Sequence, residues 1–235
     1  MTEVLVSPCG EGAVRVTVHD DDVEERWRTV HRIADWLDAN PVSGIHGWIP
    51  TYDSLLIDFD PFRASADSLA PVVRHAADTG TGTVSGRRRF VLPVVYGGHR
   101  GPDLGFVAGY LGITEDEVIA LHAGVDRVVR CLGGPAATCM LDGPAFSAPV
   151  PRLADPRLEV PANAVSLAGA QANIGTVKAP SGWRLIGLTP VNIIDPRSED
   201  LVPYRPGDVV RFTAIHESDW DSYSDTYLHE LAEPC

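Results

Sequence analysis

Positive charge is scarce in this sequence. Lysine and arginine together number 19 against 32 aspartates and glutamates, which gives a formal net charge of -13. Such a charge repels phosphate backbones at long range, so we expect no nucleic-acid partner. Lys178 is the single lysine among the basic residues. This preference for arginine indicates genomic base composition and predicts no mechanism.

Long apolar runs are also missing. The most apolar stretches are interrupted by Gly, Pro or charge, and none approaches the roughly 20 residues that a membrane-spanning helix needs. The first residues, MTEVLVSPCGEG, lack a basic start, a sustained apolar middle and a small-residue cleavage site. We therefore expect no secretion, no membrane contact and a cytoplasmic location.

Closely spaced cysteines are absent. The four cysteines are Cys9, Cys131, Cys139 and Cys235, and no C-x-x-C pair occurs among them. This spacing favours reduced thiols over a disulfide framework. It also argues against a structural zinc site, whose ligands usually come in close pairs, so we expect no metal.

The first part of the chain has the periodicity of a small α+β unit. Residues 12–18 alternate as a half-buried strand does, and apolar residues at three- and four-residue spacing predict a helix that follows Asp22 and stops at Asn40. Residues 44–50 and 54–59 are strand-like, and residues 65–78 predict a second amphipathic helix. The Gly-rich stretch 79–88 then predicts a boundary near residue 90, giving domains 1–90 and 91–235.

The second part is dominated by short apolar runs between Gly, Pro and Asn. After a strand at 90–96 and a helix at 103–110, Thr114 and Glu117 form a capping-box pattern that opens a helix ending at His122. Strands are predicted at 126–132, 164–168, 183–187, 191–194 and 208–215. Many short strands of this kind are typical of a compact barrel or sandwich. The acidic tail, 217–233, fits a packed helix or a loose end equally well.

Several segments, taken in order, resemble one family, which includes KipI, the B subunit of 5-oxoprolinase and allophanate hydrolase subunit one. Residues 93–98 and 101–104 resemble its P-V-x-Y-G-G-E-x-G-P-D-L, and residues 182–190 resemble its G-G-W-x-L-I-G-x-T-P. The other matching segments are 44–56, Val118-Ile119 with His122, Pro151-Arg152, 160–162, and Ala168-Gly169 with Gln171. The resemblance spans nearly the whole chain.

The resemblance implies both a fold and a way of working. The fold would be an N-terminal α+β domain followed by a mainly β, cyclophilin-like barrel. The chain would pair with a second, homologous barrel subunit, the C-type partner of the family. In 5-oxoprolinase that pair joins a third subunit in the ATP-dependent opening of a lactam, and in urea carboxylase related domains form the carboxyltransferase site. This chain itself would then hold no cofactor, and a partner would bind ATP.

Three departures from the family motifs fall in segments that we expect to line a pocket. The family's G-F-x-P-G-F-x-Y-L stands here as residues 133–141, in which both phenylalanines are replaced by small residues. The glutamate expected after Gly98 is His99, and the motif Q-T-G-I-Y-P is residues 171–176, QANIGT. The scaffold glycines and prolines persist, so the pattern indicates a retained fold with altered chemistry.

The catalytic candidates are His122 and Arg152. The ring of His122 exchanges a proton near neutral pH, although a histidine late on a helix also caps carbonyls. Arg152 and Arg157 follow prolines, so each guanidinium sits on stiff chain and is suited to hold a carboxylate. An ion pair at the surface or at a subunit interface explains Arg152 equally well and Arg157 better.

The remaining candidates are assigned to substrate binding. Gln171 and Asn173 offer amide groups beside Gly169, although turn formation explains an asparagine as well. Trp183 lies in a family motif. Cys139 with Asp142 and His99 could supply a thiol nucleophile and a base, but a lone cysteine is more often a small buried hydrophobe.

The leading hypothesis is therefore a divergent 5-oxoprolinase-like or carboxyltransferase-like subunit. In it, Arg152 and Gln171 would hold the substrate and His122 would move protons within a common cavity. A stand-alone biosynthetic enzyme with a pocket enlarged by the lost phenylalanines remains an alternative. A protein-binding regulator of the kinase-inhibitor kind, acting through the barrel surface and acidic tail, is the other.

Overall fold

The structure, a computed structural model, describes residues 2–81 and 87–235, and it divides the chain into two compact units, Met1–Ser85 and Gly86–Cys235. Part of the expected break at 79–88 lies outside the described residues. The first strand of the second unit begins at Arg88, because residues 88–90 already pair with two neighbouring strands.

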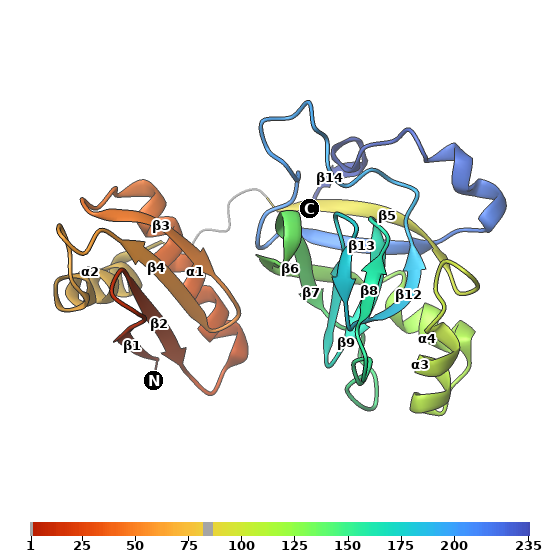
Figure 1. The fold of residues 1–235 in the computed structure, drawn as a ribbon, viewed down its shortest axis with the longest axis horizontal. Helices are drawn as coiled ribbons and strands as arrows, with labels where there is room; N and C mark the ends of the chain where they lie inside the picture. Colours follow the sequence, from red (N-terminus) through yellow and green to blue (C-terminus); the bar gives the residue numbers. More distant parts are fainter. Residues whose placement is uncertain (1, 82–86) are drawn as a thin grey trace. The chain divides into compact units, whose positions relative to one another are not determined.

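The first unit is a four-stranded antiparallel sheet with two helices. Its strand order is β1-β2-β4-β3 (Figure 1). Its elements are β1 (Glu3–Pro8), β2 (Ala13–His19), α1 (Val23–Ala39), β3 (Ile45–Pro50), β4 (Ser54–Phe59) and α2 (Ala66–Thr79). All but β1 were expected from the periodicity. β1 is an edge strand whose alternation is short, and it pairs with β2 along its whole length.

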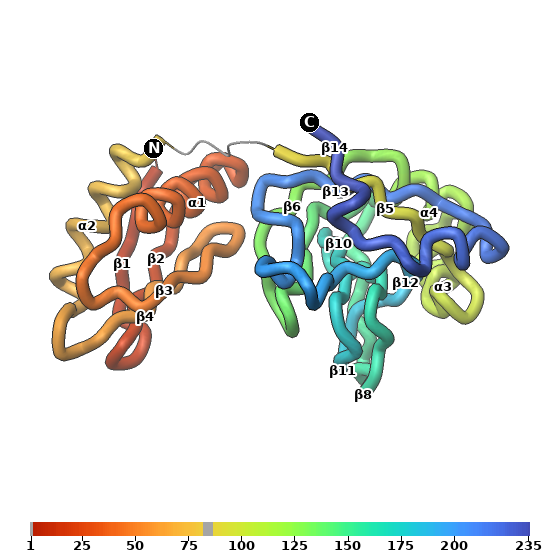
Figure 2. The backbone as a smooth tube through the Cα atoms, turned by 90° about the horizontal axis from the view of Figure 1, so that it is seen from above, coloured from red at the N-terminus to blue at the C-terminus, as the bar shows by residue number. Residues whose placement is uncertain are grey.

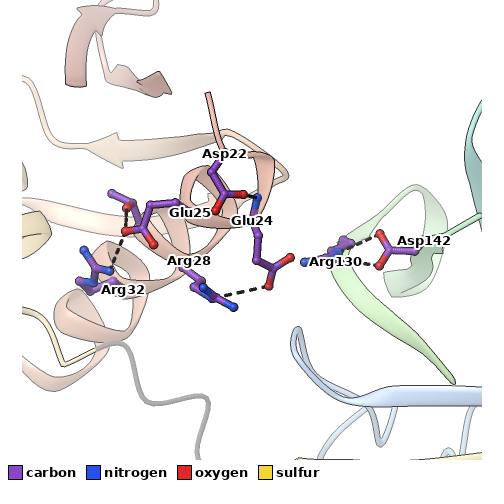
Figure 3. A network of polar contacts seen from close by, with 8 residues as sticks. Asp22, Glu24, Glu25, Arg28, Arg32, Arg130 and Asp142 are labelled. Atoms are coloured by element: carbon purple, nitrogen blue, oxygen red, sulfur yellow. Dashed lines mark hydrogen bonds and ion pairs between the residues drawn. The ribbon is translucent and has the colours of Figure 1, made fainter. Parts of the chain in front are cut away.

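Both helices pack on one face of this sheet. Val14, Val16, Leu55 and Ile57 from the sheet form a single buried cluster with side chains from α1 and α2. At the start of α1, the Asp22 carboxylate accepts a hydrogen bond from the Glu24 amide at 2.8 Å. Figure 3 shows this N-cap with the ion pairs that follow it along the helix, Glu24–Arg28 and Glu25–Arg32. The cap satisfies a free backbone amide of the first turn, and the ion pairs add to the stability of the helix. The acidic run before α1 predicts such a cap.

The second unit is a closed seven-stranded barrel. Its strands follow the order β12-β9-β10-β7-β6-β13-β5, and pairing of β12 with β5 closes the ring (Figure 1). The strands are β5 (Arg88–Tyr96), β6 (Asp126–Gly133), β7 (Thr138–Asp142), β9 (Ala164–Ala168), β10 (Gln171–Ile174), β12 (Arg184–Leu188) and β13 (Val209–Ala214). Across β6 and β7, Arg130 and Asp142 form an ion pair at 2.9 Å (Figure 3).

A separate antiparallel pair of strands stands beside the barrel sheet. It consists of β8 (Arg157–Val160) and β11 (Ala179–Ser181), which pair only with each other among the described strands (Figure 2). The pair is called the β8–β11 hairpin below, although β9 and β10 lie between its two strands in the sequence. The sequence did not predict β7, β8, β10 or β11. All four are five residues or shorter, too short to show a clear alternation.

The barrel interior is filled by apolar side chains. Phe90, Leu92, Leu141, Leu167 and Phe212 are each at most 1% exposed. The strand expected at 191–194 is absent from the described residues. Val191 and Ile193 still point into the core, but the backbone of this segment forms only an isolated bridge, between Asn192 and Tyr227 of the tail, and no continuous strand. The apolar alternation of this segment therefore predicted its burial correctly but did not predict its backbone pairing.

Two helices and the tail complete the second unit. The helices are α3 (Leu104–Leu111) and α4 (Glu115–His122), and α4 opens on the predicted capping box between Thr114 and Glu117. The tail is neither a helix nor a loose end: short 3-10 turns lead to β14 (Ala232–Pro234), which pairs with β5. Of the helices in the described parts of the chain, none combines the length and hydropathy that a bilayer crossing requires.

Candidate functional site

A cavity of about 160 Å³ lies between the barrel sheet and the β8–β11 hairpin. On the sheet side it is lined by Thr138, Met140, Ser166 and Asn173. These residues alternate with Cys139, Leu141, Leu167 and Ala172, which belong to the barrel core. Since side chains alternate across a strand, the cavity lies on the outer face of β7, β10 and β9. Its volume is similar to the roughly 150 Å³ that accommodates one benzene ring in a protein interior.

Among the residues that the structure describes, Arg152 is the single ionisable one in the lining of this cavity. Its side chain is exposed, and within the described residues its guanidinium forms no ion pair or hydrogen bond. The guanidinium lies against Gly182, where an added Cβ would sit 3.5 Å from Nε. A cationic fork without a carboxylate partner is free to hold a carboxylate ligand.

Asn173 contributes a buried and unpaired polar group to the lining. The residue is 9% exposed, and its Oδ1 atom is buried with no hydrogen-bond partner in the described parts of the chain. Ser166, its cross-strand neighbour on β9, is 4% exposed and lines the same cavity. Buried polar groups are normally paired, so an unpaired amide in a cavity wall indicates a place for a polar ligand.

The hairpin and the chain around it close the other side of the cavity. Val160, Ala179 and Ser181 come from the hairpin, and Trp183 follows it. The Trp183 amide donates to Ser181 Oγ at 3.1 Å, which fixes the turn between the hairpin and β12. Ser181 Oγ and Thr138 Oγ1 already form hydrogen bonds within the protein, so Arg152, Asn173 and Ser166 are the polar side chains that can orient a ligand.

Arg184 holds the segment that carries Arg152. Its Nε donates to the Pro151 carbonyl at 3.0 Å, and its Nη2 donates to the Arg152 carbonyl at 3.4 Å. The guanidinium also stacks on the Phe106 ring, with 3.6 Å between Cζ and the ring centroid. Arg184 therefore positions Arg152 through the backbone, a role the sequence analysis did not assign. The one feature of the sequence that pointed to Arg184 was its place in the G-W-R-L-I-G segment.

The structure does not bring His122 to this cavity. His122 is 0% exposed, its Nδ1 lies 2.7 Å from Tyr96 Oη, and its ring packs on Phe212 with 4.4 Å between centroids. Burial, with a smaller contribution from nearby Arg127, holds the pKa of His122 well below its usual value. The ring is therefore neutral and lies in the packed core, so the expected common cavity for His122, Arg152 and Gln171 is not present among the described residues.

The carbonyls at the end of α4 are capped by Arg127 and not by His122. The Arg127 guanidinium donates to the carbonyls of Leu121 and His122 at 2.7 Å and 3.0 Å. It is 4% exposed, and the negative end of the helix dipole compensates its charge.

Cys139 and Gln171 also lie away from the cavity lining. Cys139 points into the barrel core at 0% exposure, and burial raises the pKa of its thiol well above the usual value, which leaves it protonated and unreactive. Gln171 shares a strand face with Asn173 but stands at the end of β10, opposite Asp142. Asn173 therefore lines the cavity, whereas Gln171 does not.

Arg157 and His99 have other surroundings. Arg157 forms a bidentate ion pair with Asp103, so it fixes the hairpin and leaves no donor fork for a substrate carboxylate. His99 is exposed on the loop after β5. The next residue, Arg100, pairs with Glu217 at 2.6 Å and stacks on Trp220. This loop packs against the tail of the same chain and does not reach the cavity.

Two of the three departures from the family motifs do line the cavity. Gly134, Pro135 and Thr138 come from the segment that lost its phenylalanines, and Asn173 and Gly175 come from 171–176. Of the predicted site residues, Arg152, Asn173 and Trp183 thus meet in one place. Ser166 was missed, although a serine within the apolar run AVSLA was its signal.

Comparisons with known proteins agree with this architecture. The model of the carboxyltransferase domain, subdomains C and D, matches residues 4–204. The B subunit of 5-oxoprolinase from Escherichia coli O157:H7 is 35% identical over 192 residues, which are 81% of this chain and 85% of that protein. Its counterpart from Bacillus subtilis strain 168 is 29% identical over 231 residues, 94% of this chain and 96% of that one.

A solved structure extends the comparison to the fold. The urea carboxylase of Kluyveromyces lactis superimposes with a TM-score of 0.77 at 15% identity. The match covers 99% of this chain and 24% of that longer protein. At this identity the likeness concerns the fold alone.

Proposed function

Because this chain belongs to the carboxyltransferase-domain family that includes the B subunit of 5-oxoprolinase, we propose that it is a 5-oxoprolinase-like subunit whose cavity holds a small carboxylate-bearing lactam. The observation that carries the proposal is the unpaired guanidinium of Arg152 in a lining without other ionisable groups. The cavity volume of about 160 Å³ suits a ligand of one small ring, and 5-oxoproline is such a ligand.

In this proposal Arg152 holds the carboxylate and does not take part in bond cleavage. Charge-assisted hydrogen bonds of this kind contribute about 1.5–3 kcal/mol, which is roughly 10- to 150-fold in affinity. Trp183 and the hairpin provide the apolar wall that keeps the ring in place. Among the described residues, the lining contains no carboxylate, histidine, cysteine or lysine. In this proposal the groups that open the ring come from a homologous barrel subunit and a third subunit, and one of these binds ATP.

The test combines binding with turnover. We expect the purified chain to bind 5-oxoproline in isothermal titration calorimetry, and Arg152→Gln to weaken that binding roughly 10- to 150-fold. Arg74→Gln, at an exposed arginine of α2, is the matched control and should bind as the unmodified chain does. The chain alone should not open the lactam, and ring opening with ATP should appear when the products of neighbouring genes are added.

One observation favours a second candidate, a stand-alone enzyme with a remodelled pocket. The cavity is formed within a single unit of the chain. Its lining includes Thr138 and Gly175, which stand where the family motifs have phenylalanine and tyrosine. Lactam opening by the isolated chain would contradict the subunit proposal and support this alternative. Absence of both binding and an effect of Arg152→Gln would contradict the carboxylate site itself.

A further inference from the structure

The Asn173 side chain is buried in the cavity wall with its hydrogen-bonding capacity unused. The residue is 9% exposed, and within the described residues its Oδ1 accepts no hydrogen bond and its Nδ2 donates none. The unpaired, buried Oδ1 lowers the stability of the folded protein, because this atom has lost its water without gaining a partner. A ligand in the cavity would restore these hydrogen bonds.

We propose that Asn173 is a specificity-determining residue that recognises an N–H group next to a carbonyl in the ligand. A carboxamide presents an acceptor, Oδ1, and a donor, Nδ2, side by side. A lactam presents the complementary pair, with its N–H and C=O held on the same side of the ring. Two parallel hydrogen bonds can therefore form between them. The inference rests on the proposed function, because it specifies how the same cavity distinguishes its ligand.

Asn173 departs from the family motif, so this mode of recognition is specific to the present chain. The motif that residues 171–176 resemble has glycine where Asn173 stands and tyrosine where Gly175 stands. Relative to that pattern, a polar amide has been added to the wall and an aromatic ring has been removed. Neighbouring Ser166, also buried and opposite Asn173 in the register, adds a hydroxyl to the same side of the cavity.

Arg152 and Asn173 bind different parts of the ligand: Arg152 its carboxylate and Asn173 its lactam group. Both line the cavity, one at its exposed rim and one in its buried wall. Arg152 attracts any small carboxylate, whereas the amide of Asn173 is satisfied only by a ligand that donates as well as accepts. A site built to hydrogen-bond an N–H group discriminates strongly against an analogue that lacks it, because the buried acceptor is then left unpaired.

The experiment compares two probes that differ in one atom. Titration calorimetry of the full chain is carried out with 5-oxoproline and with 5-oxotetrahydrofuran-2-carboxylate, in which a ring oxygen replaces the N–H. We expect the lactone to bind about 10- to 100-fold more weakly than the lactam. In Asn173→Gly, which restores the residue of the family motif, both probes should bind with the same low affinity. Ser166→Ala, at the neighbouring wall position, should keep a preference for the lactam.

The outcomes separate this inference from the proposed function. Equal affinity of the unmodified chain for the two probes would overturn the role of Asn173, while an effect of Arg152→Gln would leave the carboxylate site standing. A preference for the lactam that survives in Asn173→Gly would also overturn it. Binding of neither probe would overturn the site and, with it, the inference. Far-ultraviolet circular dichroism and thermal unfolding of each variant establish that the fold is retained.

Discussion

Arg157 and Asp103 form a bidentate ion pair that ties the β8–β11 hairpin to the start of α3. The two contacts are Nη1 to Oδ2 at 2.7 Å and Nη2 to Oδ1 at 2.9 Å, between residues 54 positions apart. Asp103 Oδ2 also accepts a hydrogen bond from the Leu185 amide at 2.8 Å. The carboxylate thus joins three elements, and the hairpin that it holds forms one side of the cavity.

Removal of this ion pair should weaken both the fold and the cavity. For Arg157→Met we expect the free energy of unfolding to fall by about 1–3 kcal/mol, because the Asp103 side chain, 8% exposed, loses its bidentate partner and keeps only the longer contact with Arg184 at 3.8 Å. Binding of 5-oxoproline should weaken as the hairpin loosens. Urea denaturation and titration calorimetry measure the two effects.

The same hairpin offers the control for that prediction. Lys178 pairs with Glu159 at 2.6 Å, but both side chains are more than 60% exposed. Lys178→Met should therefore change the free energy of unfolding by less than about 1 kcal/mol and leave binding unchanged. Equal effects of the two substitutions would show that Arg157 is an ordinary surface residue.

Gly175 tests whether the remodelled wall creates the cavity. A Cβ at this position would meet Ala164 at 3.7 Å, an ordinary contact, and its φ lies outside the left-handed region. Gly175→Tyr restores the residue of the family motif and should fill the cavity, which lowers the affinity for 5-oxoproline by at least about 10-fold. Gly175→Ala, which adds only the Cβ, should bind as before. Retained binding in the tyrosine variant would place the ligand elsewhere.

The sequence identified the segments of the site better than the faces of its strands. Residues 133–141 and 171–176 were expected to line a pocket, and both contribute to the cavity. In the first segment Cys139 was named as a site residue and Thr138 was not, and in the second Gln171 was named beside Asn173, although of these two only Asn173 lines the cavity. All five residues of β9 are buried, so both faces of this wall are covered and alternation cannot tell the barrel core from the cavity.

The long-range ion pairs could not be predicted from the sequence either. Arg152 and Arg157 both follow prolines, and the local pattern treats them alike. Only the fold places Asp103 beside Arg157 and leaves Arg152 without an acid. Such a difference depends on strand order and hairpin docking, which short-range periodicity does not encode. The fold class itself was predicted and is confirmed, because ordered motifs along the whole chain carried it.

The tail should be held on the barrel by Arg100. Its guanidinium forms a bidentate ion pair with Glu217 and lies 3.2 Å from the centroid of the Trp220 ring. In Glu217→Gln we expect limited proteolysis of the tail to be about 1.5- to 5-fold faster, because the loss of an exposed ion pair changes local opening only modestly. Asp219→Asn, an exposed carboxylate on the same turn, is the control. The same cleavage rate in both variants would contradict an anchoring role.

Stability should depend on pH through His122. The folded protein holds the pKa of His122 well below its usual value, because the ring is fully buried and Arg127 lies nearby. In the unfolded chain the ring takes up a proton near pH 6.5. Below about pH 6.5 the unfolded state therefore binds more protons, and the free energy of unfolding decreases by up to about 1.4 kcal/mol per pH unit. Above that pH the contribution is fully present.

Urea denaturation between pH 7.5 and pH 5 checks this dependence. His122→Gln retains a hydrogen-bonding group for Tyr96 Oη but does not titrate, so its free energy of unfolding, although lower throughout, should fall less steeply with acid than that of the unmodified chain. His19→Gln, at an exposed histidine of β2, should keep the full slope. A slope unchanged in His122→Gln would mean that the ring is protonated in the folded protein, and its neutral, buried place in the core would have to be abandoned.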